Sequence, residues 1–225
     1  STGQEVENFP YNLGSVSRNQ VTVANLDSDN YPEILALTYS NAQLFAVNHD
    51  GSLLWQKNIG EQVKGGTIVT DVNGDGSKEI ALVTYAGQLY LMDTSGNNLT
   101  GFPLNVGQNV ESTPIAAKFD GNNLSGIVFG DNNGYLHSFR SDGIESPNFP
   151  IPLSGNLKVS PAVSDIDMDG DVDIVFPNDA GFYVIDIKRP VISYQWPFFM
   201  YNLSRSGNYY QNTPVQDNSA PLLTT

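Results

Sequence analysis

Apolar and polar positions along the chain form short β-rich runs that recur with a constant period. In the second unit, residues 66–72 lead into an acidic loop, residues 79–85 and 88–93 are two mostly apolar runs, and a last strand ends at Phe102. In the third unit, Asn133-Gly134 separates two such runs, and this dipeptide favours a hairpin because both residues tolerate positive φ. The pattern therefore predicts four short antiparallel strands in each unit.

Two markers follow this period. The isoleucines that close the acidic loops are 46, 47 and 47 residues apart, at Ile34, Ile80, Ile127 and Ile174. An aromatic residue of the outer strand recurs at intervals of 46, 47, 47 and 47 residues, at Phe9, Trp55, Phe102, Phe149 and Trp196. Four-stranded units of this length are typical of β-propeller blades, which must stack because a single blade cannot bury both of its faces.

The sequence thus predicts an all-β fold of propeller blades over residues 1–205, and it shows four repeats that can be part of a larger propeller. The expected repeats lie around residues 15–60, 61–108, 109–155 and 156–203, with a tail or linker at 206–225. The additional marker predicts a further outer strand near residues 5–13. That strand either closes the ring by joining the last blade or ends a blade that lies upstream of this chain.

Three of the four units contain, after their first strand, a loop that has oxygen-bearing side chains at its positions 1, 3, 5 and 9. Ca²⁺ binds about six to eight oxygens in a flexible shell, and the carbonyl at position 7 can add one. Gly76 and Gly170 follow position 5, where we expect a sharp bend with positive φ. We therefore expect about three calcium sites, with the ligands Asn25, Asp27, Asp29, Tyr31 (carbonyl) and Glu33; Asp71, Asn73, Asp75, Ser77 (carbonyl) and Glu79; and Asp165, Asp167, Asp169, Asp171 (carbonyl) and Asp173.

Calcium is favoured over three alternatives for these loops. Solvated acidic turns are the simplest alternative, but three copies in register, each before a β-rich run, disfavour them. Zinc is disfavoured because neither His49 nor His137 lies in one of the acidic loops, and Mg²⁺ prefers smaller and more rigid shells. The fourth loop, residues 118–126, is expected to be empty because Lys118 places a cation at position 1 and Gly126 removes the ligand at position 9.

The charge of the chain agrees with cation binding. The net charge is −14, and the three loops hold 11 of the 24 carboxylates, so three Ca²⁺ ions would cancel six charges and leave −8. An acidic protein is a poor ligand for nucleic acid or an anionic membrane surface, and no apolar run approaches the roughly 18 residues of a membrane helix. The absence of Cys excludes disulfides and thiolate metal sites.

The loops Asp71 to Ile80 and Asp165 to Ile174, each between two strands of a blade, resemble the FG-GAP or VCBS repeats. These repeats build the propeller of integrin alpha chains and of many bacterial secreted proteins. The resemblance covers about residues 5–205 and implies calcium binding at the cell surface, while it says little about the partner. Integrin-type propellers have more blades than the four visible here, and Glu at position 9 of the first two loops is similar to the bacterial versions.

The segment Trp196 to Gly207 is similar to a segment that ends such propellers in large bacterial surface proteins. In those proteins a linker and a sorting or adhesive domain follow, which is the interpretation that the resemblance gives to residues 211–225. No signal peptide is visible at Ser1, as is expected of a mature or trimmed product. We expect an extracellular or cell-surface location.

The sequence gives little indication of a catalytic site. No Ser/His/Asp arrangement and no phosphate-binding glycine loop is evident, and His137 is best explained as an ordinary strand position. A glycosidase carboxylate pair stays open because it needs only two acids at a suitable separation. The unit from Leu44 to Trp55 faintly resembles the repeat of quinoprotein dehydrogenases, but Trp55 is better explained by packing between blades.

We expect no enzyme but a non-catalytic module for adhesion or for scaffolding a surface assembly. Its expected partner is a protein, a glycan or a further copy of itself, without nucleic acid binding or membrane insertion. The alternatives are a lectin-like carbohydrate-binding propeller and an accessory domain of a secreted enzyme. A lectin would be expected to repeat one aromatic or amide pocket in each blade, and the sequence has no such shared set.

Overall fold

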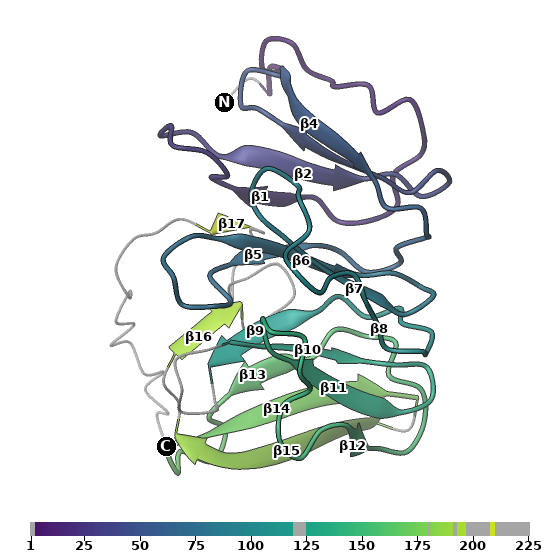
Figure 1. Cartoon of the computed structure of the whole chain (residues 1–225), viewed down its shortest axis with the longest axis vertical. Coiled ribbons are helices and arrows are strands. Elements are labelled where there is room, and N and C mark those ends of the chain that lie inside the picture. Colours follow the sequence, from purple (N-terminus) through teal and green to yellow (C-terminus); the bar gives the residue numbers. More distant parts are fainter. Residues whose placement is uncertain (1–2, 119–124, 180, 191–192, 197–207, 210–225) are drawn as a thin grey trace.

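The described part of the chain consists of β-strands in four sheets, and the class of the fold is a β-propeller built of blades. The structure is a computed structural model, described here for residues 3–118, 125–179, 181–190, 193–196 and 208–209. Figure 1 shows the sheets stacked in chain order along the long axis of the molecule. Within these residues no helix has the length and apolar character needed to cross a membrane.

The first two blades each contain four strands, as predicted. Those of the first blade are β1 (Thr22–Ala24), β2 (Glu33–Leu37), β3 (Gln43–Val47) and β4 (Leu53–Asn58). Those of the second blade are β5 (Ile68–Thr70), β6 (Glu79–Val83), β7 (Gln88–Met92) and β8 (Leu104–Asn105).

The third and fourth blades differ from each other in their outer strands. The third blade contains β9 (Ile115–Lys118), β10 (Gly126–Gly130), β11 (Tyr135–Phe139) and β12 (Ile151–Pro152). In the residues described, the fourth blade has three strands, and its last two are long: β13 (Ala162–Ser164), β14 (Asp171–Asn178) and β15 (Gly181–Pro190).

Neighbouring strands within a blade are antiparallel and follow the order of the chain. In the first blade, Val23 lies opposite Ile34 and Ala46 lies opposite Trp55. In an antiparallel meander the β1–β2 and β3–β4 connections lie at the same end of the sheet. In the first two blades the acidic loop is the β1–β2 type connection, so it lies beside the β3–β4 type turn of its own blade. In the fourth blade the acidic loop joins β13 and β14.

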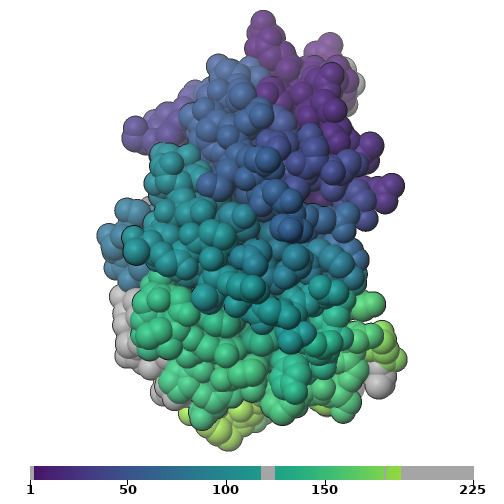
Figure 2. Space-filling view, turned by 45° about the vertical axis from the view of Figure 1, so that its right-hand side comes forward, coloured from purple at the N-terminus to yellow at the C-terminus, as the bar shows by residue number. Residues whose placement is uncertain are grey.

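The core lies between successive sheets. All five residues of β6 and all five of β10 are buried, because both faces of these strands are covered by neighbouring blades. One apolar cluster joins the first three blades, and another, with Leu157 and Phe176, joins the third and fourth. The space-filling view in Figure 2 shows the blades following one another as a continuous surface.

Polar contacts between blades repeat with the period of the sequence. The backbone N–H of Gly66 donates to Thr113 Oγ1 at 2.8 Å, and the backbone N–H of Thr113 donates to Ser160 Oγ at 3.1 Å. The three residues are 47 positions apart. Each of these buried amides therefore has a partner in the next blade, which fixes the position of one blade on the other.

Trp55 packs between the first and second blades, as expected from the sequence. Its indole Nε1 donates to the Thr94 carbonyl at 2.9 Å. A Cβ atom at Gly96 would lie 3.2 Å from the indole ring, so the turn of the second blade lies closely against it. The tryptophan is thereby explained by interblade packing.

The strand predicted near residues 5–13 is not formed, and that prediction is wrong. The segment instead lies against the β3–β4 turn, where Asn8 Nδ2 donates to the Asp50 carbonyl at 2.8 Å. A Cβ atom at Gly51 would meet Asn8, just as one at Gly96 would meet Trp55, so the segment contacts the first blade as the end of the first blade contacts the second. The strands β8 and β12 pair with β7 and β11 of their own blades, and residues 5–13 have no such partner among the described residues.

The two last strands lie away from the position predicted for them. β16 (Ser193–Trp196) pairs with β9, and β17 (Asn208–Tyr209) pairs in parallel with β1. Trp196 was expected in the outer strand of the fourth blade, but its strand extends the third blade beyond β9 (Figure 1). An edge strand has unpaired N–H and C=O groups, which explains why β1 and β9 accept another strand. Of the predicted tail, residues 206–207 and 210–225 lie outside the described residues.

Candidate metal centres

The three acidic loops share one buried contact at their position 9. The carboxylate at this position is held at the start of β2, β6 or β14, and it accepts the backbone N–H of position 2. Glu33 is 0%, Glu79 3% and Asp173 4% exposed. The distances from amide nitrogen to carboxylate oxygen are 2.6 Å for Leu26–Glu33, 2.8 Å for Val72–Glu79 and 2.7 Å for Ile166–Asp173.

The remaining loop positions also form a repeated set of contacts. The carboxylate at position 1 accepts the N–H of the glycine at position 6, at 3.1 Å for Asp71 and Gly76 and at 3.0 Å for Asp165 and Gly170. These glycines have φ of 89° and 91°, which confirms the positive φ predicted for them. In all three loops, position 3 accepts the N–H of position 5, and position 5 accepts that of position 7. The side-chain oxygens are thus folded back over the loop, as an ion-binding loop requires.

The first loop, residues 25–33, contains a buried carboxylate oxygen without a hydrogen-bond partner, Glu33 Oε1. Burial, together with the charges of Asp27 and Asp29, raises the pKa of Glu33. Asn25 Nδ2 donates to the Asp29 carbonyl and lies 3.4 Å from the Tyr31 carbonyl, so the predicted position 7 carbonyl faces the loop. If the side-chain amide of Asn25 were rotated by about 180°, its Oδ1 would face the loop in place of Nδ2.

The second loop, residues 71–79, has Asn73 at its centre. Asn73 Nδ2 donates to Asp75 Oδ2 at 2.9 Å and to Glu79 Oε1 at 3.4 Å. Burial raises the pKa of Glu79 from 4.5 to about 7, and the charges of Asp75 and Asp71 add to this. Hydrogen bonds from Ser77 and Asn73 lower the pKa of Asp75. The loop therefore holds one carboxyl that is costly to ionise, Glu79, beside one whose charged form is stabilised by hydrogen bonds, Asp75.

The third loop, residues 165–173, is the most acidic. Asp165, Asp167 and Asp173 each place one carboxylate oxygen within 4.8 Å of the others, and Asp165 Oδ1 is buried without a hydrogen-bond partner. Burial and neighbouring carboxylates raise the pKa of Asp167. From β15, Lys188 Nζ reaches Asp169 Oδ2 at 2.9 Å and also pairs with Asp186.

The structure thus brings the side chains predicted for each loop together around that loop. For Ser77 and Asp171 it shows the N–H bonded to position 5, while their carbonyls as ligands stay predictions. Of the fourth loop, predicted empty at residues 118–126, residues 119–124 lie outside the described part, so that prediction stays untested. Carboxylate and carbonyl oxygens on short, bent loops are the ligands that hard cations prefer.

His49 was not among the residues predicted for these sites. Its Nδ1 lies 3.9 Å from Asp29 Oδ2, and its ring stacks on Tyr31 with centroids 4.1 Å apart. No histidine lies within an acidic loop in the sequence. In the folded chain, however, His49 lies beside the first loop. The signal was available, because the antiparallel order of strands places the β3–β4 turn beside the β1–β2 loop.

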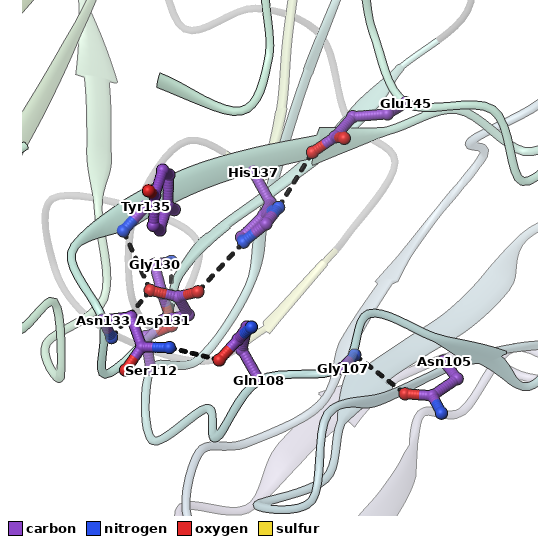
Figure 3. Close-up of polar contacts among 10 residues, drawn as sticks. All are labelled: Asn105, Gly107, Gln108, Ser112, Gly130, Asp131, Asn133, Tyr135, His137 and Glu145. Atoms are coloured by element: carbon purple, nitrogen blue, oxygen red, sulfur yellow. Dashed lines mark hydrogen bonds and ion pairs between the residues drawn. The ribbon is translucent and has the colours of Figure 1, made fainter. Parts of the chain in front are cut away.

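His137 forms a separate polar network inside the third blade (Figure 3). Its Nδ1 lies 2.8 Å from Glu145 Oε1 and its Nε2 lies 3.3 Å from Asp131 Oδ2. Asp131 Oδ1 accepts the N–H groups of Asn133 and Tyr135 in the β10–β11 turn. His137 lies in β11 as predicted, and it ties the two turns of one blade together with both ring nitrogens engaged.

The buried Glu79 should make the stability of the metal-free protein depend on pH. Between pH 4.5 and about 7 the folded protein keeps a proton that the unfolded chain releases, so stability present at low pH is lost as the pH rises to 7. The contribution is at most about 3 kcal/mol. We expect Glu79→Gln to reduce this decline in urea unfolding at pH 5 and 7.5 with a chelator present, while the part that comes from Glu33 stays.

Glu61→Gln is the matched control for that experiment, because Glu61 is exposed and lies outside the loops. Its unfolding should change with pH as the wild type does. The assignment would be wrong if the Glu79→Gln protein lost as much stability between the two pH values as the wild type.

The fold and the loops together define this chain as a β-propeller with acidic blade loops. Residues 10–119 match the family model of the lambda-carrageenase beta-propeller domain. No curated protein matches the chain.

Solved propeller structures share the fold at low sequence identity. BamB from Moraxella catarrhalis is 14% identical with a TM-score of 0.53, over 77% of this chain and 51% of that one. BBS1N, solved in complex with ARL6DN, is 12% identical with a TM-score of 0.58, over 80% and 54%. The V. cholerae biofilm matrix protein Bap1 is 17% identical with a TM-score of 0.52, over 78% and 31%. The chain spans about half the length of the first two of these structures.

Proposed function

We propose that the chain is a non-catalytic, extracellular calcium-binding propeller module that acts in adhesion or as a scaffold of a surface assembly. The observation that carries the proposal is the contact shared by the three acidic loops. In each, a buried carboxylate at position 9 is held by the N–H of position 2 while further oxygens fold back over the loop. The same arrangement in three blades is better explained by a common ligand than by three unrelated turns.

Calcium fits these loops by the chemistry of their donors. The candidate side-chain ligands at positions 1, 3, 5 and 9 of each loop are carboxylates or amides, which suits a hard cation. When bound, the ion would supply positive charge among carboxylates that otherwise repel one another. Its role is structural, since it holds the loops of a blade rigid and contributes no chemical step. This agrees with the resemblance to FG-GAP or VCBS repeats.

An extracellular role follows from the same reasoning. Sites of this kind are saturated where calcium is abundant, and the chain has no cysteine that oxidation outside the cell would affect. Propellers bind partners on the faces of the disc, where loops collect. BBS1N was solved with a partner protein, and Bap1 is described as a biofilm matrix protein. We propose a protein, a glycan or a second copy of this chain as the partner, and no nucleic acid.

Calorimetric titration with Ca²⁺ tests the proposal. The wild type should bind about three ions, and the double variant Asp71→Asn, Glu79→Gln should bind one fewer because it removes two ligands of one loop. Glu61→Gln should bind as many as the wild type. Heat changes that are absent in the wild type, or unaltered in the double variant, would contradict the proposal. Light scattering on the calcium-loaded protein then separates a self-associating scaffold from a monomeric adhesin.

A second candidate function is an accessory domain of a secreted polysaccharide-degrading enzyme, and the match to the lambda-carrageenase propeller domain favours it. The net charge of −14 opposes binding of a sulfated, polyanionic chain by this surface. Incubation with lambda-carrageenan should therefore release no reducing ends. Release that a carboxylate substitution abolishes would establish an enzyme instead. Calcium-dependent binding of the protein to neutral glycans on an array would favour the lectin alternative.

A further inference from the structure

The first acidic loop differs from the others in receiving a histidine from a neighbouring turn. His49 lies in the β3–β4 turn, which the meander places beside residues 25–33. Its ring stacks on Tyr31 at an interplanar angle of 23°, which orients the imidazole over the loop. Asp50, next to it, is engaged in the turn itself through Ser52 N and Oγ. The histidine is therefore the residue of this turn that faces the loop.

The position of His49 has no nitrogen ligand in the next two blades. The turn of the first blade closes with the N–H of Gly51 on the Asn48 carbonyl, and the later turns close with Gly96 on Asp93 and Gly143 on Arg140. His49 follows the first residue of its turn, and the residues in this place are Thr94 and Ser141. In the described residues, three groups of side chains bring at least three ligand atoms within 4.8 Å of one another, and that of the first loop is the one that includes a histidine.

A buried carboxylate points into the same place. Glu33 is fully buried, and its Oε1 has no hydrogen-bond partner. One ligand atom each from Asp29, Glu33 and His49 lies within 4.8 Å of the other two. An oxygen left unpartnered in the interior is costly unless a donor or a cation satisfies it, so this geometry indicates a ligand at the meeting point of the three side chains.

The spacing suits a small cation. Tetrahedral ligands about 2.0–2.2 Å from a zinc ion lie about 3.4 Å from one another. His49 Nδ1 and Asp29 Oδ2 are 3.9 Å apart, so they need to approach by only a fraction of an ångström. Both side chains are exposed by 40% or more, and both are therefore able to move and to leave room for water as a further ligand.

We propose that Asp29, Glu33 and His49 bind a borderline divalent transition cation of the class of Zn²⁺. Imidazole nitrogen is a good ligand for such ions, whereas Ca²⁺ prefers oxygen throughout. The inference rests on the proposed function in so far as it takes the first loop as a cation site, and it changes the ion that this loop selects. The second and third loops keep an oxygen-only set and serve as internal comparisons.

Titration with Co²⁺ and Zn²⁺ tests the inference on the full chain. Co²⁺ should bind at one site and give a visible absorption band, and Zn²⁺ should abolish that band by displacement. His49→Gln should weaken Zn²⁺ binding at least tenfold, with Ca²⁺ binding at the second and third loops unchanged. Because His49 is well exposed, this variant should fold, which the far-ultraviolet circular dichroism spectrum checks. Asp71→Asn, in the second loop, is the matched control and should leave the Co²⁺ band unaltered.

The outcomes separate the two proposals. Zn²⁺ affinity that is equal in the wild type and in His49→Gln would overturn this inference while leaving calcium binding intact. A Co²⁺ band that depends on His49 in a protein without measurable Ca²⁺ binding would sustain the inference and overturn the calcium proposal. Three equal Ca²⁺ sites with no Co²⁺ band would also overturn it, because the first loop would then behave like the other two.

Discussion

Chelation of calcium is expected to lower the free energy of unfolding by about 3–4 kcal/mol for each loop that was saturated at 100 to 1,000 times its dissociation constant. The reason is that the ion binds the folded loops and the unfolded chain holds it poorly. In a protein of this size one such site corresponds to a fall of about 6–16 °C in the unfolding temperature. Two or three sites would multiply this loss accordingly.

The loops themselves explain the size of the effect. Without an ion, Glu33 Oε1 and Asp165 Oδ1 stay buried without partners, and the oxygens of Asp165, Asp167 and Asp173 lie within 4.8 Å of one another. Each feature costs free energy that a divalent cation would remove.

The measurement is thermal unfolding followed by circular dichroism with excess Ca²⁺, with excess Mg²⁺ and with a calcium chelator. Mg²⁺ should protect less because it demands a smaller and more regular shell. The protein with both Asp71→Asn and Glu79→Gln should lose about one site's share of the stabilisation. An unfolding temperature that is the same in all three solutions would show that the acidic loops are ordinary turns.

Phe176→Ala is expected to destabilise the protein by about 3–5 kcal/mol, the usual cost of removing a fully buried phenylalanine. Phe176 is 0% exposed in β14, and its ring lies against the third blade. A Cβ added at Gly130 would be 2.5 Å from that ring, so the two blades meet there without spare room. The substitution would leave a cavity between the third and fourth blades that their backbones cannot easily close.

Phe182→Ala is the matched control, since Phe182 lies in the adjacent strand β15 and is 74% exposed. It should change the free energy of unfolding by no more than about 0.5 kcal/mol. Urea unfolding of both variants with calcium present compares them directly. Equal losses in the two proteins would show that the fourth blade does not pack on the third in the way described.

The repeat itself was predictable from the sequence. Each blade must alternate apolar runs with turns at a fixed interval, and this pattern is visible in one chain without any comparison. Strands β6 and β7 occur where the sequence predicted them, and Gly76 and Gly170 adopt the expected positive φ. The spacing of the carboxylates also predicted which loops carry clustered oxygens, since alternating side chains in a tight loop point to the same side.

The two ends of the chain could not be predicted in this way. The marker at Phe9 has the right spacing for an outer strand, but a strand forms only where another strand offers its edge. In the part of the chain that the structure describes, residues 5–13 have no such edge beside them. The marker at Trp196 meets the open edge of β9 and pairs with it. A periodic sequence gives the position of a residue within its repeat, whereas strand pairing depends on which edges stay free in the assembled fold.

What the sequence alone determined is therefore local: the blades, their turns, and the oxygen-rich loops within each unit. What the tertiary structure decided is which side chains from different turns meet. His49 is 16 residues beyond Glu33 in the sequence, yet both face the first loop because the meander returns the chain to the same end of the sheet. The spacing of residues within a loop determines which of its own side chains can bind an ion. Which side chain of a neighbouring turn joins them depends on the register of the strands that connect the loop to that turn.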